Sequence, residues 1–176
     1  MSAPSPPPSA AVETDRALRV PARRFAQLRA AHGVPVWMYW FCWASTAFGG
    51  SLGSCHGLDI PFFFGNLGQP DVDRFTGTAP SRQAVADHCT AALLRLARTG
   101  EPGWNSYQER ASALRPVNGT KSAGQAVSGE EHSLRLTLMI DTFAAEVPDP
   151  EPDLRLLWER FATCCDDQIG SGMIAP

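Results

Sequence analysis

The segment VPVWMYWFCW, Val34 to Trp43, constrains the fold of this chain more than any other stretch. It is short, aromatic and apolar on both faces, a pattern typical of a strand buried between two layers of helices. It is far too short to cross a bilayer, so we expect no membrane as a partner. A helical pattern precedes the segment and a loop rich in Gly and Ser follows it. These features predict an α/β fold.

Two helices are predicted around this strand. The stretch TDRALRVPARRFAQLRAAHG predicts a helix that Thr14 or Asp15 caps and Gly33 ends, or one that begins only at Pro21. The stretch PSRQAVADHCTAALLRLARTGEP predicts the clearest helix, with Ser81 as its cap and Gly100 at its end. Its expected apolar stripe consists of Val85, Cys89, Leu93, Leu94 and Leu96.

The rest of the chain has weaker patterns. LRLTLMI, Leu134 to Ile140, alternates for part of its length and predicts an edge strand. The segment from Trp104 to Ser133 reads as mostly irregular. Near the C-terminus, the helical spacing of four apolar residues predicts a last helix: Leu154, Leu157, Trp158 and Phe161.

Composition indicates which parts of the chain fold and which classes of partner are excluded. Residues 1–13 form a leader rich in Pro, Ser and Ala that we expect to be disordered, and residues 162–176 are expected to form a flexible tail. Residues 14–161 are then expected to be the folded part of the chain. The net charge is -3 and the basic residues are scattered, which argues against nucleic acid as a partner.

Cysteine usage points to a reducing compartment. The count is odd, at five, and no secretory signal precedes the domain, so we expect free thiols and a cytoplasmic protein. Cys164 and Cys165 are adjacent, and the sequence assigns them no role.

The loop GGSLGSCHGLDIPFFFGN contains a G-x-S-x-G pattern at Gly49, Ser51 and Gly53. In hydrolases this pattern works as a nucleophile elbow because the serine lies on a sharp turn between a strand and a helix. Here SCHGLDIP follows, and its Gly and Pro residues prevent a helix from opening. We therefore do not predict Ser51 as a nucleophile.

Cys55 and His56 invite other interpretations. Side chains of adjacent residues rarely face each other, which weakens a Cys-His nucleophile pair, and no spacing typical of a metal site accompanies them. His56 follows a buried strand, where α/β folds place catalytic groups. The residues alone leave His56 open between a catalytic base and a solvated or packed side chain.

A resemblance to a known family bears on this choice. GSLGSCHGLDIPFFFGN, with PVWMYWFCW before it and ALLRLARTGEPGWNSY after it, resembles the C-terminal part of a type-B carboxylesterase. This is the family of bacterial para-nitrobenzyl esterases and animal cholinesterases, which have the α/β-hydrolase fold. The resemblance extends from Thr14 to Trp158. It implies that residues 14–161 are the C-terminal part of a carboxylesterase domain. Such a part has a few sheet strands with flanking helices and is an incomplete fold on its own.

The resemblance also implies roles for residues of the loop. His56 would be the base of a catalytic triad that hydrolyses carboxylic esters, and Asp59 would be a structural hydrogen-bonding group rather than the triad acid. Gly57 would allow a tight turn beside the imidazole. Full-length members need no metal or organic cofactor. The aromatic run is expected to be chiefly core: Phe62, Phe63 and Phe64.

The family's nucleophile elbow, oxyanion-hole glycines and triad acid lie upstream of the region that matches. We therefore expect this chain to be inactive alone, and to act on a small-molecule ester only if an upstream polypeptide supplies those groups. One alternative is a noncatalytic docking module, in which His56 is a relic. Another is a stand-alone enzyme that uses Cys55 with His56.

Overall fold

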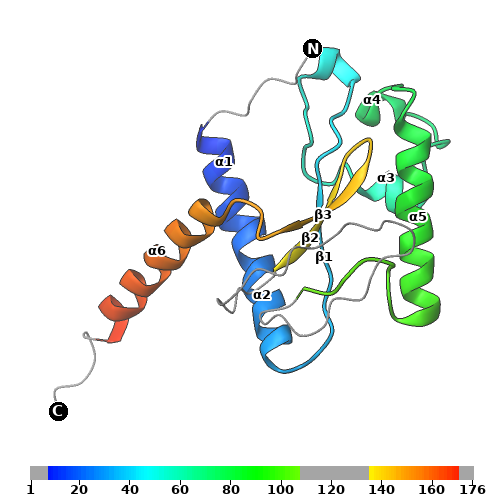
Figure 1. The fold of residues 1–176 in the computed structure, drawn as a ribbon. Helices are drawn as coiled ribbons and strands as arrows, with labels where there is room; N and C mark the ends of the chain where they lie inside the picture. Colours follow the sequence, from blue (N-terminus) through cyan, green and yellow to red (C-terminus); the bar gives the residue numbers. More distant parts are fainter. Residues whose placement is uncertain (1–7, 108–134, 171–176) are drawn as a thin grey trace, which may run out of the picture.

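The computed structural model describes residues 8–107 and 135–170, with side chains for 9–107 and 135–161. The predicted irregular segment lies mostly outside these residues, as do the first part of the leader and the end of the tail. A three-stranded sheet forms the centre of the fold, in the order β1 (Met38–Phe41), β2 (Leu136–Ile140), β3 (Ala144–Pro148). β1 runs parallel to β2, and β2 runs antiparallel to β3 (Figure 1).

The strand predicted at Leu134 to Ile140 exists, but it is not an edge strand. β2 is the central strand, because it pairs with β1 on one side and with β3 on the other. Its side chains at Leu136, Leu138 and Ile140 are buried accordingly. The sequence pattern does not predict β3, and β1 is shorter than the apolar segment that contains it.

The helix before β1 is longer than predicted. It consists of α1 (Pro8–Thr14), a π-helical turn (Asp15–Arg19) and α2 (Val20–Ala31), so it begins within the expected leader. The π-helical turn accommodates Pro21, which has no N–H to donate: the preceding N–H, of Val20, reaches back to the carbonyl of Asp15. The helix ends where predicted, with Gly33 at φ +68.

Helices cover both faces of β1 (Figure 1). On one face, the guanidinium groups of Arg19 and Arg23 lie 4.6 and 5.1 Å from the ring of Trp40. On the other face lie α3 (Ile60–Phe63), α4 (Asp73–Thr76) and α5 (Arg82–Thr99). This second layer holds the main apolar core: Trp43, Leu58, Phe62, Leu67, Val85, Ala86, Cys89, Leu138 and Ile140.

Two details of α5 differ from the prediction. Its buried side consists of Val85, Ala86, Cys89 and Ala92, which repeat at the spacing of a single helix face. Leu94 and Leu96 lie off that face and are exposed. Ser81 is the residue before the first turn of the helix, but its side chain makes no capping hydrogen bond; its hydroxyl accepts a hydrogen bond from Trp43 Nε1. Gly100 ends the helix in the left-handed conformation, as predicted.

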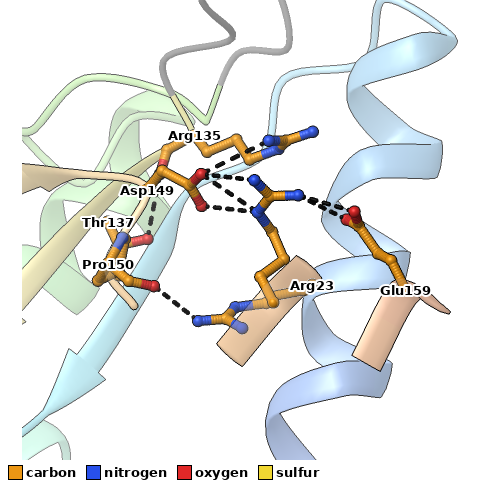
Figure 2. Close-up of polar contacts among 7 residues, drawn as sticks. Arg23, Arg135, Thr137, Asp149, Pro150 and Glu159 are labelled. Atoms are coloured by element: carbon orange, nitrogen blue, oxygen red, sulfur yellow. Dashed lines mark hydrogen bonds and ion pairs between the residues drawn. The ribbon is translucent and has the colours of Figure 1, made fainter. Parts of the chain in front are cut away.

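The last helix, α6 (Pro152–Gly170), extends away from the sheet and continues past residue 161, where we expected the tail to begin. Its base is held by a polar cluster (Figure 2). Arg155 and Arg135 both reach the carboxylate of Asp149, and Arg155 also pairs with Glu159. Arg23 of α2 donates to the carbonyl of Pro150 at 2.8 Å. The cluster thus joins α6, the end of β3 and α2.

Candidate active site

His56 lies on a tight turn beyond the carboxyl end of β1. The turn runs from Cys55 to Leu58 and is closed by a hydrogen bond from the Leu58 N–H to the Cys55 carbonyl, at 3.2 Å. Gly57 follows His56 with φ +78, a conformation that glycine adopts without strain. Leu58 is fully buried and anchors the turn in the core, while the imidazole of His56 is exposed to solvent.

Two hydrogen bonds tie the residues beside this turn to β1. The Ser54 hydroxyl, before the turn, donates to the carbonyl of Phe41 at 2.5 Å. After the turn, the carboxylate of Asp59 accepts a hydrogen bond from the Tyr39 hydroxyl at 2.8 Å. Burial raises the pKa of Tyr39, and the hydrogen bond to Asp59 raises it further, so Tyr39 is the donor. Asp59 therefore has the hydrogen-bonding role expected of it.

Aromatic side chains pack beneath the turn. Phe62 is fully buried, and its ring centroid lies 5.0 Å from that of Phe41 and 4.9 Å from that of Trp43. The ring of Phe63 lies 4.8 Å from that of Tyr39. Phe64 departs from the prediction: it follows the last residue of α3 and is 65% exposed. These contacts fix α3, and with it the chain that leaves the His56 turn.

The loop before the turn, from Ser45 to Gly53, is closed by a backbone bridge between its two ends. Ser45 and Gly53 form an isolated antiparallel bridge, and the buried Ser45 hydroxyl donates to the carbonyl of Phe75 at 2.7 Å. Ser51 lies at the exposed tip between them, after two glycines with positive φ. The next helix, α3, begins only at Ile60. The G-x-S-x-G pattern therefore lies outside a strand-turn-helix context, as predicted.

The side chains of Ser51, Cys55 and His56 form no catalytic pair with one another in the structure. Within the described part of the chain, His56 makes no side-chain hydrogen bond or ion pair, and neither Ser51 nor Cys55 is bonded to it. Cys55 is half-buried. Among residues 8–107 and 135–170, no group of three or more His, Cys, Asp or Glu side chains is placed to hold a metal ion. Of the three candidate side chains in this described loop, Ser51, Cys55 and His56, the exposed imidazole is the one that can both take and give a proton near neutral pH.

Tyr39 and Ser54 are the residues that sequence reasoning missed. The alternation of the strand places Tyr39 on the same face as Phe41 and Trp43, the face that packs on α3. This alternation could have been used to predict that Tyr39 faces α3. Nothing local marks Ser54, because its partner is a backbone carbonyl distant in sequence.

None of the helices in the described ranges is long and apolar enough to cross a membrane.

Comparison with solved structures finds carboxylesterases. Carboxylesterase EST55 of Geobacillus stearothermophilus is 27% identical over 90% of this chain and 29% of that chain, with a TM-score of 0.63. A thermophilic PNB esterase is 24% identical over 72% of this chain and 22% of its own, with a TM-score of 0.52. An esterase from the anaerobe Clostridium hathewayi, which can hydrolyse aliphatic aromatic polyesters, is 18% identical over 89% of this chain and 27% of its own, with a TM-score of 0.62. No protein-family model matches the chain.

These similarities confirm the predicted fold class. The mixed sheet and its flanking helices correspond to part of an α/β-hydrolase fold, and the resemblance to carboxylesterases seen in the sequence holds in three dimensions. The chain spans less than a third of the length of each of these three esterases. This partial coverage agrees with a portion of the fold rather than the whole.

Proposed function

We propose that this chain is the histidine-bearing part of a serine carboxylesterase. The observation that carries the proposal is the position of His56: an exposed imidazole on a braced turn at the carboxyl end of a parallel strand, in a fold similar to carboxylesterase EST55. In the proposed reaction His56 takes the proton of a serine hydroxyl as that oxygen attacks the ester carbonyl. His56 then returns the proton to the departing alcohol, and the acyl-enzyme is hydrolysed by water activated in the same way.

We propose further that the serine, the acid that orients His56 and the oxyanion hole come from an upstream polypeptide. Partial coverage of the matched esterases supports this, as does the open edge of β1, which pairs with no strand on one side in the described residues. An unpaired edge presents backbone N–H and C=O groups to an incoming strand. A base alone supplies only a small share of the rate acceleration, because oxyanion stabilisation is usually the larger contribution.

The first test measures hydrolysis of p-nitrophenyl acetate and p-nitrophenyl butyrate by the purified chain. We expect a rate no greater than that of free imidazole at the same concentration, with no change in Ser51→Ala. Saturable turnover that Ser51→Ala abolishes would show that this loop holds its own nucleophile and would overturn the proposal.

The second test supplies the missing groups. The chain is co-expressed with carboxylesterase EST55 from which the matched region has been deleted, and the purified complex is assayed on the same esters. We expect saturable turnover that His56→Ala abolishes. His88→Ala is the matched control, because His88 is an exposed histidine on α5, and this variant should retain activity. Turnover that survives His56→Ala would refute the role of this residue.

The second candidate is a docking module without catalysis, and the open edge of β1 favours it equally. Its distinguishing property is that binding does not depend on the imidazole. A complex that forms equally with His56→Ala, yet never hydrolyses either ester, would favour this alternative.

A further inference from the structure

We propose that Tyr39 and Ser54 are positioning residues that hold the His56 turn against β1 from both sides. Their catalytic consequence rests on the proposed function, but the geometry does not. Both contacts are hydrogen bonds to or from β1, one just before the turn and one just after it. We call the pair of contacts, Ser54 to Phe41 and Tyr39 to Asp59, the β1 clamp.

The two anchors of the β1 clamp bracket the histidine closely. Ser54 precedes His56 by two residues and Asp59 follows it by three. Their partners, Phe41 and Tyr39, are two residues apart on one strand, β1. A short segment that is fixed at both ends to a rigid strand keeps few conformations open to it.

Core packing also fixes the turn, on the side that faces α3 and α5. Leu58 and Phe62 have no exposed surface, and the Thr90 hydroxyl of α5 donates to the carbonyl of Phe62 at 2.9 Å. The imidazole itself has no hydrogen bond to hold it within the described residues. The position of His56 therefore depends on its backbone, which Leu58 and Phe62 hold on the core side and the β1 clamp holds on the side of the strand.

The two contacts differ in strength. Tyr39, which is 38% exposed, donates to a carboxylate, and hydrogen bonds to charged groups are the stronger kind. Ser54 is also exposed, but it donates to a neutral carbonyl rather than to a carboxylate. We therefore expect loss of the Tyr39 hydroxyl to release the turn more than loss of the Ser54 hydroxyl.

This arrangement matters for the proposed reaction because a general base must lie within hydrogen-bond reach of the proton that it takes. A displacement of about 1 Å at such a group costs roughly 100-fold in rate. A turn that is already fixed does not have to be ordered when the upstream polypeptide arrives. The β1 clamp thus prepares His56 for a serine that lies outside this chain.

The test is ¹³C NMR of the full chain with ¹³Cε1-labelled histidine, in which the His56 resonance is identified by its loss in His56→Gln. Microsecond-to-millisecond exchange is measured by relaxation dispersion. We expect a narrow His56 signal in the wild-type chain. In Tyr39→Phe, which keeps the ring and removes only the hydroxyl, we expect exchange broadening at His56 and none at His32 or His88.

Matched variants separate positioning from general damage. Asp59→Asn keeps an oxygen that accepts from Tyr39 and should leave His56 narrow, whereas Asp59→Ala should broaden it. Ser54→Ala should broaden it less, and Ser51→Ala should not, because Ser51 is a neighbouring exposed serine without a side-chain hydrogen bond. If Asp59→Ala does not fold, Tyr39→Phe and Asp59→Asn still decide the question.

A narrow His56 signal in Tyr39→Phe and in Ser54→Ala would overturn the β1 clamp, whatever the chain catalyses. In the complex with truncated EST55, Tyr39→Phe should lower kcat on p-nitrophenyl butyrate by tenfold or more with KM nearly unchanged. A lower kcat at an unchanged KM indicates that the lost contact stabilises the transition state and not the bound substrate. A third outcome is also informative. If the His56 signal of the chain broadens in Tyr39→Phe, but the complex with truncated EST55 never hydrolyses esters, the β1 clamp is supported and the esterase function is rejected.

Discussion

Arg155 and Asp149 meet in a two-pronged ion pair: Nε of Arg155 donates to Oδ1 of Asp149 at 3.0 Å, and Nη2 donates to Oδ2 at 2.9 Å. The third guanidinium nitrogen, Nη1, donates to Glu159 at 2.8 Å. Burial lowers the pKa of Arg155, but its hydrogen bonds to Asp149 and Glu159 outweigh burial and raise that pKa. Arg155 is therefore a charged, nearly buried link between α6 and the end of β3 (Figure 2).

Asp149→Asn should lower the free energy of unfolding by about 2 kcal/mol, because it leaves the nearly buried Arg155 and Arg135 without that carboxylate. Asparagine tolerates the positive φ of Asp149, so the variant changes charge with little backbone strain. Urea unfolding followed by circular dichroism measures the change.

Glu13→Gln is the control for this pair. Glu13 and Arg16 are also an ion pair, at 2.8 Å, but both side chains are 64% exposed. Its loss should cost less than about 0.5 kcal/mol. Equal effects of the two variants would mean that the cluster of Figure 2 is no stronger than a surface pair.

Gly77→Ala should destabilise the protein by at least about 2 kcal/mol, because Gly77 has φ +74 and ψ −166, a region open essentially to glycine alone. An added Cβ would also lie 2.6 Å from the backbone nitrogen of Ala47 and would overlap the side chain of Thr46. Thermal unfolding of the variant measures the cost. Gly68→Ala, where a Cβ meets nothing within 4 Å, should change stability little, and similar effects at both positions would contradict the argument.

The sequence allowed the strand around Trp40 to be predicted because its signal is local. Alternation put Tyr39, Phe41 and Trp43 on one face and Trp40 on the other, and the structure places the first three against α3 and the last beneath Arg19 and Arg23. The glycines that end helices were predictable for the same reason, since a left-handed residue after a helix favours glycine by its own sterics.

Pairing between distant segments was not predictable in this way. The residues of β3, AAEVP, have no strand pattern of their own, and they form a strand because they pair with β2. The central position of β2 depends on that pairing. The contact between Tyr39 and Asp59 likewise depends on how the loop returns over β1, so the sequence predicted the role of Asp59 but not its partner.

Thiol labelling tests whether Cys55 reacts with the help of His56. No hydrogen bond joins the two side chains in the described structure, so labelling of Cys55 by a disulfide reagent at neutral pH should change less than about twofold in His56→Ala. The labelled peptides are separated and identified by mass, so that Cys55 is followed apart from the other cysteines. A tenfold slower reaction in His56→Ala would instead support a Cys-His pair.

Alkaline pH should destabilise the protein through Cys89. Burial raises the pKa of this thiol from 9.0 to about 12, and the nearby charge of Asp59 contributes. The unfolded chain releases the proton at lower pH than the folded one does. The stability from keeping Cys89 neutral is therefore complete below pH 9.0 and is lost progressively up to about pH 12.

This loss should reach up to about 1.4 kcal/mol per pH unit across that range. Cys89→Ala removes the titrating group, so its free energy of unfolding, measured in urea from pH 8 to 11, should fall less steeply than that of the wild type. The small cavity that it leaves lowers stability equally at every pH, and does not alter the slope. Cys42→Ala should flatten the slope less, because Cys42 is only half-buried, whereas Cys89 is buried. Parallel curves for Cys89→Ala and the wild type would show that the thiol beneath the His56 turn is not kept neutral by the fold.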